Sequence, residues 1–459
     1  MRALARVETA AQKRADLWSG FYDSGSRCIA LGEEGPVRHF FLPVRPRPNR
    51  TLRRARIHRR NGIDVYRVAE DMHLNVTDAR TGEIGERTIS KGSFQIPVAQ
   101  PAGRLLRALL DQRVDMDEQF IKRQLQRKED FLPDQIYDVT AWSLPLAFDV
   151  PCLATEEKVS PAAEPWDGEQ VGGSELTKAK VAYLVRPTDG ALEALSQWLQ
   201  NGIRVHVTDQ PFVFGEQKYP RGTLILKVHG NRSNLLAIVQ AAVRRYDLDV
   251  SGTDSGFVTE GAHFGGPHVK WVRPPRIVLA MDRPASASVG HTWYLFDQVL
   301  RYPTTRVSCR SLDDLDLDKF DVVILPDGRY SASTAFNESF ANHLKSWVSA
   351  GGTLVLVQGA AVWAASDKNP LASLTRVAKP PAEDAAGNGA QKTDNSGTDR
   401  ADKTERWPEG VPGAFLKGRV FDQHWLTFGY AKTMNVFCNG NVFFEPLSEE
   451  EGRNIVQFS

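Results

Sequence analysis

The sequence predicts an α/β protein made of consecutive doubly wound parallel-sheet units, and residues 318–361 carry the clearest signal. The apolar run Val322–Leu325 is closed by Pro-Asp-Gly, which is typical of a buried parallel strand that ends in a tight turn. A second apolar run covers 353–357, and between the two runs residues 344–348 show helical spacing before a glycine pair. Together these features predict one βαβ unit with a right-handed crossover.

An internal repeat predicts two similar units ahead of this one. The segment NGIDVYRV at Asn61 is echoed by NGIRVHVT at Asn201, and KGSFQIPVAQ at Lys91 is echoed by RGTLILKV at Arg221. In each copy Asn-Gly suits a left-handed turn between a helix and the following strand. Each copy therefore predicts an α/β unit of the same plan.

These patterns divide the chain into four parts. Residues 1–150 are expected to form the first α/β unit with a helical lead-in of mixed charge, 151–178 a linker, 179–272 the second unit and 273–459 the third. Within the third unit, 380–405 has almost no large apolar residue, so we expect a disordered surface insertion there.

Composition favours an ordinary globular protein and gives no support to several classes of partner. The 459 residues have room for roughly three domains of about 150 residues each. A formal net charge of +1 gives no reason to expect nucleic acid or an anionic membrane as a partner. No apolar run approaches the roughly 18 to 20 residues that span a bilayer, and the N-terminus lacks the apolar core of a signal peptide. The cysteines Cys28, Cys152, Cys309 and Cys438 are far apart, which favours buried free thiols, with disulfides as the alternative.

An arginine-rich stretch, RPRPNRTLRRARIHRR, lies directly before the first Asn-Gly. From Thr51 onward it fits a helix whose Leu52 and Ile57 face inward, and we expect its arginines to face solvent. A phosphate-binding patch is the alternative interpretation.

The ends of the two central strands are the candidate ligand site. Ligands of open parallel sheets bind beyond the carboxyl ends of the strands, so Asp327, Gly328, Gly359 and Ala360 are expected to border a cleft. For Asp327 the favoured alternative is a structural role that caps the turn or the next helix.

This βαβ unit resembles the class I glutamine amidotransferase fold, in which a Cys stands in a strained turn after such a strand. Here the turn reads Gln358-Gly359-Ala360-Ala361, and none of these side chains can attack a carbonyl. The motifs GxSxG and GxxxxGK[ST] are also absent. No catalytic residue is therefore predicted.

Two weaker patterns suggest a metal site. His263 and His268 in GAHFGGPH could converge on a metal, but an ordinary loop is favoured because no third ligand is near in sequence. The five aspartates between 313 and 321 lack the glycine and terminal Glu of a calcium loop, so a solvated acidic connection is favoured.

Several segments, taken in order, resemble the C-terminal portion of large bacterial zinc carboxypeptidase-like proteins of the carboxypeptidase A type. They are GSFQIPVAQPAGRLLRALLD, IYDVTAWSLPLAFDV, FVFGEQKYPRGTLIL, FDVVILPDG, LKSWVSAGGTLVLVQGAA and PGAFLKGRVFDQHWLTFGY. The resemblance implies an upstream zinc peptidase domain as partner, zinc as the cofactor of the full-length protein, and export or a periplasmic location.

The zinc motif of that family is missing here. None of the ten histidines is followed by Glu at the third position, so His-x-x-Glu does not occur and no cofactor is expected in this chain. We therefore expect a non-catalytic accessory region that acts in substrate binding or domain packing, within a fragment that lacks the peptidase domain. The alternatives are an active metallocarboxypeptidase or amidase with an unrecognised site, and a stand-alone ligand-binding or interaction module. A peptide or a small molecule is the expected class of ligand.

Overall fold

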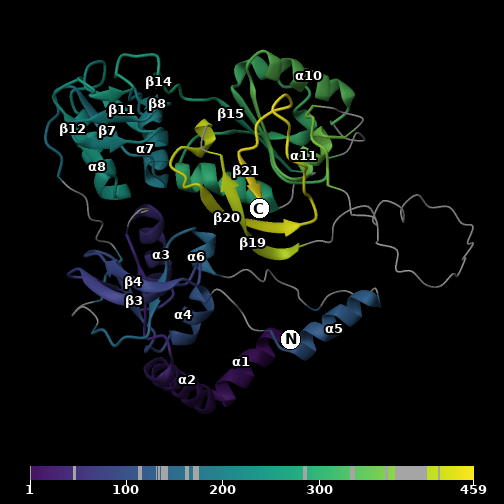
Figure 1. The fold of residues 1–459 in the computed structure, drawn as a ribbon. Helices are drawn as coiled ribbons and strands as arrows, with labels where there is room; N and C mark the ends of the chain where they lie inside the picture. Colours follow the sequence, from purple (N-terminus) through teal and green to yellow (C-terminus); the bar gives the residue numbers. More distant parts are fainter. Residues whose placement is uncertain are drawn as a thin grey trace, which may run out of the picture.

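The computed structural model describes residues 2–44, 48–111, 116–130, 132, 135, 143–160, 165–168, 175–282, 287–330, 336–366, 371–377, 411–421 and 424–458. These residues form a mixed α/β protein with five sheets, four of them antiparallel and one parallel (Figure 1). The expected insertion 380–405 lies outside the described residues.

The chain begins with two helices, α1 (Arg2–Gln12) and α2 (Arg14–Glu34), which run along the outside of the first unit (Figure 1). The C-terminal end of α2 packs directly on the backbone, because a Cβ on Gly32 would lie 2.4 Å from the amide nitrogen of Ala99. This close approach holds α2 against the body at one end.

The first unit contains six strands and four helices. In chain order these are β1 (His39–Leu42), α3 (Pro48–Arg60), β2 (Tyr66–Arg67), β3 (Met72–Asp78), β4 (Ile84–Ile89), β5 (Phe94–Pro97), α4 (Gly103–Leu110), α5 (Glu118–Glu129), α6 (Leu144–Ala147) and β6 (Leu153–Thr155). The sheet has the order β2-β5-β1-β6-β3-β4, so β6 belongs to it although it falls within the expected linker 151–178.

The second unit lies on a five-stranded sheet. Its elements are β7 (Ala182–Val185), α7 (Asp189–Gln200), β8 (His206–Thr208), β9 (Phe212–Phe214), β10 (Gln217–Tyr219), β11 (Leu224–Lys227), α8 (Leu235–Tyr246), β12 (Val250–Thr253), β13 (Glu260–Gly261) and β14 (Val269–Trp271). The main sheet has the order β12-β7-β11-β8-β14, while β10-β9-β13 form a small separate sheet.

The first two units share one plan, as the sequence repeat predicts. Four strands of the first unit have the order β2-β5-β1-β6, and their counterparts in the second have the order β8-β11-β7-β12. The Asn-Gly turns also match, with φ of 75° at Gly62 and 71° at Gly202. After each glycine an isoleucine amide closes the helix end, from Ile63 to the His58 carbonyl at 3.1 Å and from Ile203 to the Trp198 carbonyl at 2.9 Å.

The prediction of parallel sheets is wrong for these two units, because their strand pairs are antiparallel. The apolar runs that suggested parallel strands reflect burial on both faces. Tyr183 and Val185 of β7 pack with α7 and α8, while Ala182 and Leu184 pack on the other side with Phe212 and its neighbours. Two-sided burial produces the same sequence pattern in either strand direction.

The third unit is built on the parallel sheet. It contains β15 (Ile277–Met281), α9 (Ala287–Tyr294), η1 (Leu295–Leu300), β16 (Thr305–Ser308), η2 (Cys309–Ser311), η3 (Leu317–Lys319), β17 (Val322–Leu325), α10 (Glu338–Ser349), β18 (Thr353–Leu356) and α11 (Gly359–Ala364). The strand order is β16-β15-β17-β18, and each neighbouring pair is parallel. The βαβ unit predicted at 318–361 is therefore present as β17-α10-β18.

The C-terminal part is an antiparallel sheet of β19 (Val411–Val420), β20 (Thr433–Gly440) and β21 (Val456–Phe458), with a short helix η4 (Trp425–Thr427). Residues 428–435, which run from the end of η4 into β20, reach the other units. A Cβ on Gly222 would lie 2.5 Å from Cβ of Phe428, and Asn435 Nδ2 donates to Asp149 Oδ1 at 3.3 Å. This segment thus contacts both the first and the second unit.

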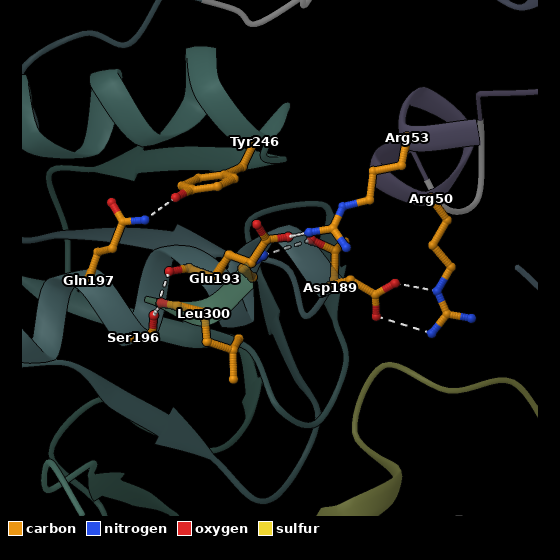
Figure 2. Close-up of polar contacts among 10 residues, drawn as sticks. Arg50, Arg53, Asp189, Glu193, Ser196, Gln197, Tyr246 and Leu300 are labelled. Carbon is orange, nitrogen blue, oxygen red and sulfur yellow. Dashed lines mark hydrogen bonds and ion pairs between the residues drawn. The ribbon is translucent and has the colours of Figure 1, made fainter. Parts of the chain in front are cut away.

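Helix α7 is the joint between the first two units. Figure 2 shows Arg50 and Arg53 of α3 directed at Asp189 and Glu193 on the first turns of α7, with an ion pair in each case. The acidic residue Asp189 suits this position because the N-terminal end of a helix carries partial positive charge.

The same helix holds the third unit through its opposite end. Ser196 Oγ donates to the carbonyl of Leu300 (Figure 2). Gln200 Nε2 donates to the carbonyl of Arg301 at 2.6 Å. Because these acceptors lie at the end of η1, α7 connects all three units.

Candidate functional site

The carboxyl edge of the parallel sheet gathers four polar side chains. Asp282 follows β15, Cys309 follows β16, Asp327 comes two residues after β17 and Gln358 two residues after β18. Because parallel strands end at a common edge, these residues face one region. Burial, and then the Asp282 carboxylate, raise the pKa of the Cys309 thiol to about 11.

Gln358 occupies a strained backbone position between β18 and α11. Its φ is 42° and its ψ is −102°, a combination that side-chain-bearing residues rarely adopt. The side chain is exposed. A strand, a strained residue and a helix in this order have the geometry of a nucleophile elbow, but an amide occupies the position of the nucleophile.

Asp327 closes the turn next to Gln358. Its Oδ1 accepts a hydrogen bond from the Gly359 amide at 3.0 Å, and its own amide donates to Ser288 Oγ at 3.2 Å. In nucleophile elbows the amide after the nucleophile stabilises the oxyanion. Here that amide, which belongs to Gly359, donates to the Asp327 carboxylate instead. Asp327 therefore caps α11 and not α10, the next helix after Asp327 in the sequence.

The structure brings the four predicted cleft residues together, but the two turns that carry them pack directly against each other. A Cβ on Gly359 would lie 2.0 Å from the Gly328 carbonyl oxygen, so the two turns touch through their backbones. Ala360 is 0% exposed and packs in the core. Asp327 and Gly328 are half-buried beside it.

The two candidate metal-ligating histidines have different environments. His268 Nδ1 pairs with Asp209 Oδ1 at 2.8 Å, whereas the His263 side chain is exposed on the neighbouring loop. Asp209 also pairs with Lys270 at 3.2 Å. Among the residues that the structure describes, no group of three or more His, Cys, Asp or Glu could hold a metal, so these residues do not fit a zinc site.

Two of the five aspartates in the acidic stretch 313–321 are paired with cations. Asp321 makes an ion pair with Arg276 at 2.9 Å, and Asp316 pairs with Lys319 at 3.2 Å. These are partly exposed pairs that hold the connection before β17, as the solvated interpretation predicts.

A groove at the end of the C-terminal sheet has the size of a ligand site. Its volume is about 900 Å³, and its walls include Arg419, Lys432 and Arg453 together with Val420 and Ile455. These three cations form no ion pair in the part of the chain that the structure describes, and Glu449 is the acidic residue among the lining residues. The sequence interpretation missed this groove because its walls come from three separate segments.

The arginine-rich helix differs from its sequence interpretation. Arg54 and His58, one turn apart on α3, are each 0% exposed. Among the residues that the structure describes, their side-chain nitrogens have no well-formed hydrogen bond, and the Cys152 thiol is the polar group beside Arg54. Burial, and then Arg54, lower the pKa of His58 to about 3. The prediction that the arginines face solvent is wrong here, because Arg54 points into the unit beside Cys152 while Arg50 and Arg53 face α7.

No protein-family model, curated protein or solved structure matches this chain. Within the described ranges, every helix is too short or too polar to cross a membrane.

Proposed function

We propose that this chain is a non-catalytic accessory region of a zinc carboxypeptidase-like protein and that its main role is domain packing. The observation that supports this most is the elbow at Gln358, which has the backbone geometry of a reactive turn without its chemistry. The family assignment rests on the sequence resemblance.

Two features argue against acyl transfer at this elbow. A carboxamide is not a nucleophile, and the amide that would stabilise an oxyanion is bonded to Asp327. The thiol at this edge of the sheet, Cys309, is 2% exposed with a pKa raised to about 11, so its thiolate is scarce at neutral pH.

A packing role is supported by the contacts of α7. One helix makes ion pairs with the first unit and hydrogen bonds with the third. Such contacts hold units in a set orientation, which an accessory region needs if it is to support a neighbouring domain.

The test is the zinc content and the hydrolytic activity of the purified chain. We expect no stoichiometric zinc after dialysis against a weak chelator, and no cleavage of blocked peptides or of glutamine above the buffer rate. One zinc per chain, or turnover that a chelator abolishes, would replace this proposal with the active metallocarboxypeptidase.

The basic groove supports a second candidate, binding of a peptide through its carboxylate. Arg419, Lys432 and Arg453 supply positive charge, while Val420 and Ile455 supply apolar walls. A ligand with a carboxylate and an apolar side chain matches both features.

The test compares the binding of N-acetyl-Leu-Leu, which has a free carboxylate, with the binding of its C-terminal amide, which has the same apolar side chains without the charge. We expect calorimetric binding of the acid and at least threefold weaker binding of the amide, about 0.7 kcal/mol. Lys432→Ala should weaken the acid only, whereas Lys345→Ala, an exposed lysine on α10, should leave binding unchanged. Equal binding of acid and amide would remove carboxylate recognition.

A further inference from the structure

Three basic side chains lie side by side on neighbouring strands of the second unit. The register of β8 with β14 continues past the end of β8, because the Val272 amide donates to the Val205 carbonyl at 2.9 Å. This register places Arg204 opposite Arg273. The register of β11 with β8 brings Lys227 to the other side of Arg204. Lys227, Arg204 and Arg273 are called the basic row below.

A carboxamide holds Arg204 and Lys227 next to each other. Asn231 Oδ1 accepts a hydrogen bond from the Arg204 amide at 2.8 Å. Asn231 Nδ2 donates to the Arg204 carbonyl at 3.0 Å and to the Lys227 carbonyl at 2.8 Å. Burial, and then the charges of Lys227 and Arg204, lower the pKa of His206. The two cations therefore act on one place at this end of the sheet.

The basic row lies on the face of the sheet that α7 and α8 do not cover. Val205 and Val207 pack with these two helices, so the residues next to them in β8 face the other way. On that other face Ile225 packs with aromatic residues of the small sheet β10-β9-β13. Trp271, which belongs to the edge strand, is 53% exposed there. The basic row and the Trp271 ring are thus open to a ligand from the same side.

The basic row carries charge that the described chain does not neutralise. Within the described ranges none of its three side chains makes an ion pair. Two acidic residues at the ends of neighbouring strands are paired with other cations, Asp209 with Lys270 at 3.2 Å and Asp321 with Arg276 at 2.9 Å. Like charges opposite each other destabilise a sheet, so the row has a cost that a bound anion would remove.

A groove of about 530 Å³ begins beside the basic row and runs towards the third unit. Its lining includes Trp271, Arg273, Pro274, Pro275, Val322 and Thr353. The Arg273 guanidinium lies 5.6 Å from the centre of the Trp271 ring. The volume is in the range of small-molecule sites. The groove therefore offers a flat apolar surface directly next to unpaired positive charge.

We propose that the basic row and Trp271 bind a small polyanion that carries a planar aromatic group, of the class of nucleoside di- and triphosphates. The phosphates accept charge-assisted hydrogen bonds from the row, and the base packs against Trp271 in the groove. A simple anion would leave the Trp271 ring uncovered, and an apolar ligand would leave the cations unpaired. A nucleotide matches both features.

The first measurement is calorimetric titration of the purified chain with ADP, inorganic pyrophosphate and adenosine in magnesium-free buffer. We expect ADP to bind and pyrophosphate to bind at least about fivefold more weakly, because stacking of the base adds to charge recognition. Adenosine should not bind measurably, and the affinity for ADP should fall as salt is added. Absence of ADP binding, or equal affinities for ADP and pyrophosphate, would overturn the proposal.

Variants separate the two parts of the site. Arg273→Ala should weaken ADP and pyrophosphate alike, at least about fivefold, because both ligands lose a cation. Trp271→Ala should weaken ADP and leave pyrophosphate unchanged. Arg244→Ala removes the same charge from α8 on the covered face and should change neither affinity. Circular dichroism and thermal unfolding report whether each variant is folded. Unchanged ADP affinity in folded Arg273→Ala and Lys227→Ala would overturn the proposal.

A short single-stranded oligonucleotide tests the macromolecular alternative, because stacking rings and cations also bind nucleic acid. We expect it to bind no more tightly than ADP and to be displaced by ADP. An oligonucleotide that binds at least about tenfold more tightly than ADP, and that Arg273→Ala weakens, would assign the row to nucleic acid and overturn the small-molecule proposal.

Discussion

At the scale of single residues, α3 contains the most unusual chemistry in the described chain. Arg54 is buried beside Cys152, and burial lowers the pKa of Arg54 while Cys152 raises it. Among the described residues the only polar group that acts on this guanidinium is the Cys152 thiol, a weak hydrogen-bond acceptor, so the guanidinium loses its hydration and gains little in return. Such a group costs stability rather than supplying it.

Arg54→Met should therefore leave the free energy of unfolding unchanged or raise it by about 1 kcal/mol or more. Arg50→Met on the same helix should lower it by about 1 kcal/mol, because Arg50 is paired with Asp189. Urea unfolding of the two variants makes the comparison. A large loss for Arg54→Met would show that the guanidinium has a partner that stabilises it.

His58 predicts how stability depends on pH. Its folded pKa of about 3 lies below its unfolded value of 6.5, so the unfolded chain binds the proton more readily. Above pH 6.5 the titration of His58 does not change the free energy of unfolding, because the imidazole is neutral in both states. As the pH drops from 6.5 towards 3, the free energy of unfolding falls by up to about 1.4 kcal/mol per pH unit. Urea unfolding at several pH values should show this slope, and His58→Phe should flatten it. An unchanged slope in that variant would assign the effect to other groups.

At the scale of elements, the elbow between β18 and α11 combines a close backbone contact at Gly359 with a strained backbone at Gln358. Gly359→Ala should lower the free energy of unfolding by about 1–3 kcal/mol, since its Cβ would meet the Gly328 carbonyl oxygen. Gly290→Ala on α9, where a Cβ meets nothing within 4 Å, should instead raise it by about 0.5–1 kcal/mol. Thermal unfolding of both proteins measures the difference, and equal effects would contradict the contact.

The strain at Gln358 makes a separate prediction. Gln358→Gly should raise the free energy of unfolding by about 1 kcal/mol, because glycine adopts a φ of 42° without the steric cost. Gln358→Ala keeps the strain and is the matched control. If the glycine and alanine variants unfold at the same temperature, the elbow is not strained.

At the scale of the whole molecule, α7 couples the three units. Glu193→Ala should remove the pair with Arg53 and loosen the joint, so calorimetry should show a broader or split unfolding transition. A double-mutant cycle with Arg53→Ala should give a coupling of about 0.5–1 kcal/mol. Additive effects of the two substitutions would mean that the pair does not hold the units together.

Local features were predictable because they depend on neighbouring residues. The βαβ unit at 318–361, the glycine turns of the repeat and the buried thiol of Cys309 follow from apolar runs and from the backbone freedom of glycine. Asp327 as a cap was also predictable, although the helix it caps is α11 and not α10.

Long-range features were decided by tertiary structure. The continuous apolar run of β7 specifies burial on both faces, but the direction of its neighbours depends on how the chain returns to the sheet. The same limit applies to Arg54, whose sequence context resembles that of Arg60, which is exposed at the end of the same helix. The sequence by itself determined the main elements, the repeat and the absence of a nucleophile at the elbow. Only the tertiary structure decided the direction of the strands, the burial of Arg54 and the hydrogen bond between Asp327 and Gly359. These three features depend on contacts between residues that are distant in sequence.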